Sequence, residues 1–226
     1  MKRRFRVVMV SLLSAAAFLL LGAANAAADF PNPPADTADM MKGTQTAVLA
    51  GGCFWGMNGV FERLKGVVDV TSGYSGGEKN TAEYEMVSSG TTGHAESIQV
   101  QYDPSKISYG TLLKIFFSVA HDPTQLNFQG PDHGTQYRSA IFYANAGQKQ
   151  VAEQYIKTLD QARVYPARIV TQVVPLKAFY AAEDYHQKFL DKNPDYPYIV
   201  YWDLPKIADL QRSYPQLVAT NAAIGG

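Results

Sequence analysis

The sequence predicts an α+β fold, in which helices pack on a mostly antiparallel sheet. Apolar residues make up 46% of the 226 residues, which is enough to bury a sizeable core and argues against disorder. Segments with the alternating pattern of strands are interspersed with segments whose apolar residues recur at helical spacing. A chain of this length is expected to form one domain.

The first six expected elements follow the order β-α-β-β-α-β. Strands are expected where β-prone or alternating residues occur, and helices where apolar residues recur every three or four positions. Ser108 is a suitable N-cap for the second helix, which carries Leu112 and Phe116. The expected strands cover 46–49, 67–71, 98–102 and 139–143, and the expected helices cover 54–64 and 108–117. This order predicts a ferredoxin-like split βαβ core, which is a two-layer sandwich.

Further elements extend this core and add C-terminal helices. A helix is expected at 147–162, a strand at 169–174 and a second helix at 178–190. Residues 121–137 contain two prolines, two glycines and several amides, so they are expected to form a loop. Loops of this length are often functional, which makes this segment a candidate part of an active site.

The first 26 residues have the pattern of a secretory signal peptide. Four cations lie in residues 1–6, an uncharged apolar run follows at 7–21, and small residues surround cleavage patterns that end at Ala26 and Ala28. The alternative is an uncleaved membrane anchor, but a spanning helix needs ~20 apolar residues, more than this run provides. The arginines resemble a twin-arginine export signal only weakly. We therefore expect a periplasmic or otherwise secreted protein, with no stable membrane insertion after cleavage.

Cleavage of the signal changes the charge of the chain. The full sequence has 20 basic and 20 acidic residues, whereas removal of residues 1–26 leaves 16 basic residues and a net charge of −4. A mildly acidic protein is a poor match for nucleic acid, whose phosphates attract basic surfaces. Residues 27–44 are rich in Ala, Pro and Asp without periodicity, which predicts a flexible lead-in. Residues 45–226 are expected to form a single catalytic domain that acts as a monomer.

Cys53 is the one cysteine of the sequence, and it lies at the start of a predicted helix. Because the sequence has no second cysteine, an internal disulfide and a multi-cysteine metal cluster are excluded. Gly51 and Gly52 allow a tight turn, and the unpaired N–H groups of a helix start favour the reactive thiolate. Phe54 and Trp55 could form an apolar wall beside it or pack in the core. A buried, unreactive thiol is the alternative, although an unpaired cysteine is a liability in an oxidising compartment.

Polar residues that could assist Cys53 lie in turns. Glu96 precedes one expected strand, and Asp132 and Tyr137 precede another. Loop ends of neighbouring strands can converge at one edge of a sheet, where a helix-start cysteine would also lie. A glutamate beside an apolar wall has a raised pKa and can donate a proton near neutral pH. The four histidines lack metal-ligand spacing, so no metal site is expected.

Seven short motifs occur in order along the chain. They are Gly-Cys-Phe-Trp-Gly at 52–56, Gly-Tyr-Ser-Gly-Gly at 73–77, Gly-Thr-Thr-Gly-His-Ala-Glu at 90–96, Tyr-Asp-Pro at 102–104, His-Asp-Pro-Thr at 121–124, Asp-His-Gly-Thr-Gln-Tyr-Arg-Ser at 132–139 and Phe-Tyr-Ala-Ala-Glu-Asp-Tyr-His-Gln at 179–187. With these motifs the chain resembles the A-type peptide methionine sulfoxide reductases, from about residue 46 to 205. Any one motif is weak evidence, whereas seven in order are highly specific.

The resemblance implies a reaction and a role for each matching residue. The reaction would be thiol-dependent reduction of methionine S-sulfoxide, free or in oxidised proteins, for protein repair. Cys53 would attack the sulfoxide sulfur and become a sulfenic acid, while Glu96 would protonate or hydrogen-bond the oxygen. The remaining implied site residues are Phe54 and Trp55 for the methyl group, and Tyr84, Asp132 and Tyr137 for the oxygen. No metal, flavin or nicotinamide cofactor is implied.

One feature departs from the pattern of that family. Many members carry one or two further cysteines, often near the C-terminus, which resolve the sulfenic acid as an internal disulfide. Residues 193–226 contain no cysteine. We therefore expect an external thiol, from a thioredoxin-like protein or a small molecule, to attack the sulfenic acid of Cys53 directly.

Two other functions remain compatible with a cysteine at a helix start. An acyl hydrolase or acyltransferase would use His133 or His186 as the general base and would hydrolyse esters with a burst. A secreted binding module would merely bury Cys53, which would then resist alkylation in the folded protein.

Overall fold

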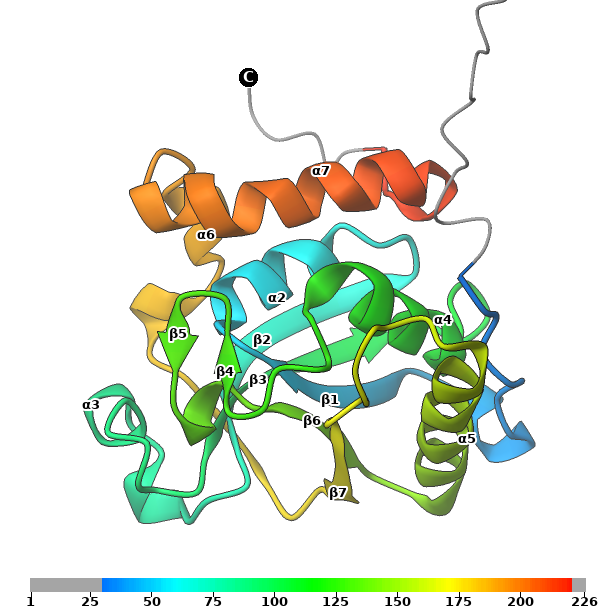
Figure 1. Cartoon of the computed structure of the whole chain (residues 1–226), viewed down its shortest axis with the longest axis horizontal. Coiled ribbons are helices and arrows are strands. Elements are labelled where there is room, and N and C mark those ends of the chain that lie inside the picture. Colours follow the sequence, from blue (N-terminus) through cyan, green and yellow to red (C-terminus); the bar gives the residue numbers. More distant parts are fainter. Residues whose placement is uncertain (1–29, 221–226) are drawn as a thin grey trace, which may run out of the picture.

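The computed structural model describes residues 30–220, which form a six-stranded sheet covered by helices (Figure 1). The strand order is β7-β6-β1-β3-β2-β8, in which β6 and β7 are parallel and all other neighbours are antiparallel. The strands of this sheet are β1 Gln45–Gly51, β2 Val67–Ser75, β3 Ala95–Tyr102, β6 Ser139–Tyr143, β7 Gln172–Pro175 and β8 Phe179–Ala181. The predicted α+β class is confirmed.

The helices within these residues differ widely in length. The α-helices are α2 Phe54–Glu62, α3 Tyr84–Val87, α4 Tyr109–Ile115, α5 Ala146–Ala162, α6 Phe189–Lys192 and α7 Leu204–Ser213. Short 3-10 turns lie at Ala38–Met41, Lys79–Thr81, Thr135–Tyr137, Asp184–His186 and Pro215–Leu217, and π-helical turns at Phe116–Ala120 and Ile199–Asp203. As predicted, the Ser108 side chain accepts a hydrogen bond from the Thr111 N–H at the start of α4.

The main core lies between the sheet and α2. Leu49, Ile98 and Val100 of the strands pack in one cluster with Met57 and Phe61 of the helix. Helix α7 packs across α2 on the side away from the sheet (Figure 1), so α2 is enclosed from both sides. This arrangement places the start of α2, and with it Cys53, under the C-terminal part of the chain.

The opposite face of the sheet carries a second, smaller cluster. Val48, Ala50, Ala95, Ala140 and Phe142 are buried there. Strand residues of the central sheet therefore alternate between two apolar environments, which fixes the register of the strands.

The structure contradicts the helix predicted at 178–190. Residues Phe179–Ala181 form β8 and pair with the end of β2, and a left-handed Lys188 (φ 54°) precedes the short helix α6. The Gln187 side chain bonds the backbone N–H and carbonyl of Ser72, while the Glu183 carboxylate accepts a hydrogen bond from the Tyr84 N–H. These partners are distant in sequence, so local helical spacing was a misleading signal for this segment.

The loop predicted at 121–137 contains a small hairpin. Strands β4 Phe128–Gln129 and β5 Asp132–His133 pair with each other, apart from the main sheet. The 3-10 turn Thr135–Tyr137 follows and leads directly into β6. The hairpin gives Asp132 and Tyr137 defined positions.

Residues 30–42, which fall within the segment expected as a flexible lead-in, lie against α4 and α5. The Asp36 carboxylate accepts hydrogen bonds from the N–H groups of Tyr109 (2.6 Å) and Gly110 (2.9 Å) at the start of α4. Met40 is fully buried, and the Tyr155 hydroxyl donates to the carbonyl of Pro31. Asp36 therefore caps α4 from a distant part of the chain, which composition alone does not reveal.

Replacing Asp36 by alanine is expected to lower the free energy of unfolding by about 1 kcal/mol, because two N–H groups of the helix start lose their acceptor. Urea denaturation measures this loss. Asp195→Ala, which changes an exposed aspartate in a turn, is the matched control and should leave the midpoint unchanged. Equal midpoints for the two variants would show that the cap contributes nothing.

No helix among residues 30–220 is long and apolar enough to cross a membrane. The predicted signal peptide of residues 1–26 lies outside the residues that the structure describes.

Candidate active site

Cys53 lies in the connection between β1 and α2, at the N-cap of the helix. Gly52 precedes it with φ +90°, and an added Cβ there would lie 2.5 Å from the Gln129 side chain, so only glycine fits this turn. The turn directs Cys53 into the protein, where the residue is only 8% exposed. A substrate must therefore enter a partly closed site to reach the sulfur.

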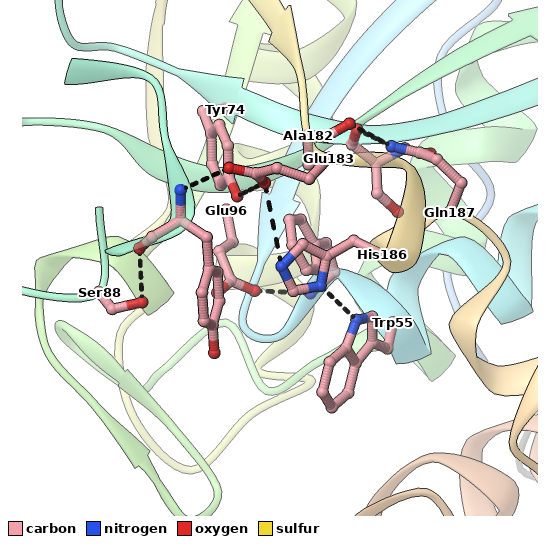
Figure 2. A network of polar contacts seen from close by, with 11 residues as sticks. Trp55, Tyr74, Ser88, Glu96, Ala182, Glu183, His186 and Gln187 are labelled. Atoms are coloured by element: carbon pink, nitrogen blue, oxygen red, sulfur yellow. Dashed lines mark hydrogen bonds and ion pairs between the residues drawn. The ribbon is translucent and has the colours of Figure 1, made fainter. Parts of the chain in front are cut away.

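Glu96 lies on β3 directly beside the start of α2. Its Oε2 accepts a hydrogen bond from the Phe54 N–H at 3.0 Å, and the residue is 3% exposed (Figure 2). Burial raises its pKa to about 8; the Phe54 N–H opposes this shift, and the charges of Asp132 and Asp203 add to it. Most Glu96 carboxyls are consequently protonated at neutral pH, as a general acid requires.

The structure corrects the expectation that the helix start lowers the pKa of Cys53. Burial raises the pKa of the thiol well above its ordinary value, and the charges of Glu96, Asp203 and Asp132 add to this effect. The Trp55 backbone N–H acts in the opposite direction but does not outweigh burial. In the resting protein Cys53 is thus a thiol, and its proton must leave when the sulfur reacts.

The two aromatic residues after Cys53 occupy different environments. Phe54 is buried in the core, with its ring 4.9 Å from that of His186. Trp55 is only half-buried; it stacks on Phe189 with ring centroids 3.8 Å apart, and Tyr198 meets it edge-on. Trp55 therefore forms an accessible apolar wall, whereas Phe54 supports the wall from behind.

Tyr84 at the start of α3, Asp132 of β5 and Tyr137 of the following 3-10 turn face the same site. The pKa of Tyr137 is raised by burial and by the charges of Glu96 and Asp132, and Cys53 adds to the same shift. Burial and the charge of Glu96 likewise raise the pKa of the Tyr84 hydroxyl. Both phenols therefore remain protonated donors at physiological pH.

Tyr198 is a site residue that the sequence analysis missed. Its hydroxyl donates a hydrogen bond to Oδ2 of Asp132, and its ring contacts Trp55. Burial raises the pKa of Asp132, while this hydrogen bond opposes the shift. The sequence contains 14 tyrosines, so residue type alone could not single out Tyr198.

A polar network behind Trp55 was also not predicted (Figure 2). The Trp55 Nε1–H donates to Nδ1 of His186 at 3.1 Å, and Nε2 of His186 lies 4.0 Å from the Glu183 carboxylate. Glu183 also accepts hydrogen bonds from the Tyr74 hydroxyl and the Tyr84 N–H. The network thus orients the Trp55 indole and holds the backbone that carries the Tyr84 side chain.

The histidines required by an acyl hydrolase are engaged elsewhere. Nδ1 of His186 accepts from Trp55 and its Nε2 faces Glu183, while burial lowers the pKa of the ring. His133 is exposed and stacks on Phe128. Neither is hydrogen-bonded to Cys53 in the described residues, so a Cys–His catalytic pair is not formed there.

Within residues 30–220, no group of three or more His, Cys, Asp or Glu side chains is placed to hold a metal ion. The described site combines one thiol, one protonated carboxyl, several phenols and an apolar wall. These features are typical of a cysteine-dependent enzyme, with hydrogen-bond donors beside an apolar surface in its site.

Comparison with known proteins identifies the family. The family model described as peptide methionine sulfoxide reductase matches residues 45–217, and the chain belongs to this family. The peptide methionine sulfoxide reductase MsrA 2 of Mesorhizobium japonicum is 61% identical over 175 residues, covering 77% of this chain and 90% of that protein. The MsrA 2 of Synechocystis is 54% identical over 183 residues, covering 81% and 84%.

Solved structures with the same fold agree with this assignment. Reduced Mxr1 from Saccharomyces cerevisiae superposes with a TM-score of 0.64 at 37% identity, over 68% of this chain and 87% of that one. Methionine sulfoxide reductase A of Corynebacterium diphtheriae gives a TM-score of 0.60 at 38% identity, over 73% and 82%. The chain is therefore an oxidoreductase of the methionine sulfoxide reductase A type.

Proposed function

We propose that this protein reduces the S epimer of methionine sulfoxide, free or within oxidised proteins, with Cys53 as nucleophile and Glu96 as general acid. One observation carries the assignment. The start of α2 brings the Cys53 thiol close to the Glu96 carboxyl, whose pKa is about 8. The Phe54 N–H holds this carboxyl in place by donating a hydrogen bond to it. A sulfoxide oxygen becomes strongly basic as its bond to sulfur breaks, so it needs such an acid.

The first half-reaction transfers one oxygen atom to Cys53. The cysteine sulfur attacks the sulfoxide sulfur, Glu96 protonates the oxygen, and the thiol proton restores Glu96. The attack forms a transient S–S bond, the S–O bond of the substrate breaks, and the oxygen leaves as hydroxide. Hydroxide then attacks the Cys53 sulfur and breaks the S–S bond, which leaves Cys53 as a sulfenic acid and releases methionine. The cysteine sulfur loses two electrons and the methionine sulfur gains them, so methionine leaves without any other reductant.

The site can select one epimer because it has separate subsites. Trp55 offers an apolar surface for the ε-methyl group, and the hydroxyls of Tyr84 and Tyr137 are donors for the oxygen. Asp132 supports the oxygen subsite together with Tyr198. A pocket that fixes methyl and oxygen in different places distinguishes the two configurations at sulfur.

An external thiol completes the cycle. Cys53 is the one cysteine of the sequence, so its sulfenic acid cannot form a disulfide within the chain. A first external thiol attacks the sulfenic sulfur and releases water, and a second thiol resolves the mixed disulfide and restores Cys53. A thioredoxin-like protein supplies both thiols from one molecule.

We further propose that the protein repairs oxidised proteins outside the cytoplasm, as a monomer. The signal-peptide pattern of residues 1–26 supports export to the periplasm or beyond, followed by cleavage after Ala26 or Ala28.

The central strand order β6-β1-β3-β2 supports the interpretation of the domain centre as a ferredoxin-like split βαβ core.

Turnover of S- and R-sulfoxide substrates with dithiothreitol tests the proposed function. We expect reduction of the S epimer and none of the R epimer, because only one configuration places methyl and oxygen in their subsites. After one turnover without reductant, mass spectrometry should find Cys53 as the adduct of a sulfenic-acid trap. Absence of S-specific turnover would refute the function, and a disulfide-linked dimer as the main product would refute the one-cysteine cycle.

A further inference from the structure

Asp203 is a buried acidic residue that the proposed mechanism does not use. It ends the π-helical turn Ile199–Asp203 and precedes α7, and it is 0% exposed. Its Oδ1 accepts a hydrogen bond from Nζ of Lys206 at 3.1 Å. Its Oδ2 is buried without a hydrogen-bond partner among the described residues. A half-satisfied buried carboxylate is costly, so its presence calls for an explanation.

Asp203 lies against the first turn of the helix that carries the active site. A Cβ added at Gly56 would lie 2.0 Å from Oδ1 of Asp203 and 2.9 Å from Nζ of Lys206. Gly56 is the third residue after Cys53, and glycine inside a helix costs about 1 kcal/mol relative to alanine. A glycine inside α2 and a half-satisfied buried carboxylate are both unfavourable. Together they allow the Asp203–Lys206 ion pair to lie close to the reactive thiol.

The charge of Asp203 acts on the groups that carry the chemistry. It contributes to the raised pKa of Cys53, of Glu96 and of Tyr198. Burial raises the pKa of Asp203 itself; Lys206 lowers it, and Asp132 raises it further. The titratable groups that face Asp203 are therefore Cys53 at the start of α2, Glu96 on β3, Asp132 on β5, Lys206 on α7, and Tyr198 just before the π-helical turn.

We propose that Asp203 is a positioning residue of the active site, whose buried carboxylate keeps the protons of Cys53 and Glu96 in place until the sulfoxide binds. This role rests on the proposed function, in which Glu96 must start as an acid. This role also explains how the unpaired Cys53 avoids oxidation in the absence of substrate, because a thiol is much less readily oxidised than a thiolate. Lys206 makes the buried charge tolerable by pairing with it.

The Asp203→Asn variant, which is neutral and similar in shape, tests this role. The rate of Cys53 alkylation by iodoacetamide is measured against pH, and it reports only this residue because the chain has no other cysteine. We expect the midpoint to fall by about one pH unit, since a neighbouring negative charge is removed. The alkaline limb of S-sulfoxide turnover should move to lower pH as well. Alkylation at pH 7 would then accelerate while reduction at pH 8 slows, a pair of opposite effects that loss of structure does not produce.

Asp209→Asn is the matched control, because Asp209 lies on α7, which Asp203 precedes, and pairs with Arg212 at the surface. It should leave both pH profiles unchanged. Asp203→Ser, smaller and also neutral, should shift both profiles in the same direction as Asp203→Asn. Neutral variants with the wild-type alkylation midpoint, or neutral variants that both fail to fold, would overturn the proposal. Because alkylation needs no sulfoxide, this result is independent of whether the proposed function holds.

Discussion

Replacing Cys53 by serine is expected to reduce S-sulfoxide turnover on the order of 10⁴-fold or more, because the nucleophile is lost. A serine hydroxyl cannot take up the sulfoxide oxygen as the cysteine sulfur does when it becomes a sulfenic acid. The sequence has no second cysteine to supply the two electrons instead. Serine is nearly isosteric and Cys53 is buried, so the fold should be retained. Steady-state turnover with dithiothreitol measures the loss.

The interpretation of this variant requires that its binding site stays intact. Circular dichroism should match the wild type, and sulfoxide binding should still change the fluorescence of the tryptophans. A Cys53→Ser variant that retains more than one hundredth of the activity would exclude Cys53 as the electron donor.

Replacing Glu96 by glutamine is expected to lower kcat by about 10²–10⁴-fold, the range that a general acid contributes. The glutamine oxygen can still accept the Phe54 N–H, so the start of α2 should keep its geometry. The variant loses only the proton that the sulfoxide oxygen requires. In the wild type, the acid form decreases above the pKa of about 8, so turnover should fall there.

Glu96→Gln is expected to lower turnover but to raise stability relative to the wild type as pH rises. Because the pKa of Glu96 is higher in the folded state than in the unfolded chain, its contribution is fully present below about pH 4.5 and is lost as pH rises to about 8. Melting temperatures of Glu96→Gln should therefore gain on those of the wild type across this window. Turnover that is unchanged in Glu96→Gln would exclude the residue as the acid.

Glu62→Gln provides a matched control at the other end of α2. Burial also raises the pKa of Glu62, to about 8, and neighbouring Asp191 adds to this shift. Glu62 nevertheless has no contact with the reacting groups and lies beside Arg63. Its replacement should preserve turnover, which separates the chemistry of Glu96 from the general effect of removing a buried acid.

Sequence patterns predicted those parts of the fold that depend on local spacing. The turn at Gly52, helix α2 and the central strands follow from short-range signals, and their order indicated a mostly antiparallel sheet. The helix predicted at 178–190 was wrong because the conformation of this segment depends on partners that are distant in sequence. Gln187 binds Ser72, and strand β8 adds to the edge of β2. No local pattern contains this information.

The same division applies to the site. Motifs located Cys53 and Glu96, whereas Tyr198 and Asp203 became site residues only through the packing of the C-terminal segment on α2. The charge state of Cys53 was predicted from the helix start alone, and burial reversed its direction. Desolvation depends on the whole assembled structure, so a linear pattern cannot supply it.

The packing of the C-terminal segment on α2 has a consequence for protein synthesis. Cys53 is synthesised long before Tyr198 and Asp203, which lie beside its helix. A growing chain therefore displays its thiol before these residues can surround it. The burial and the neighbouring charges that keep Cys53 protonated are therefore complete only after the C-terminal segment packs on α2.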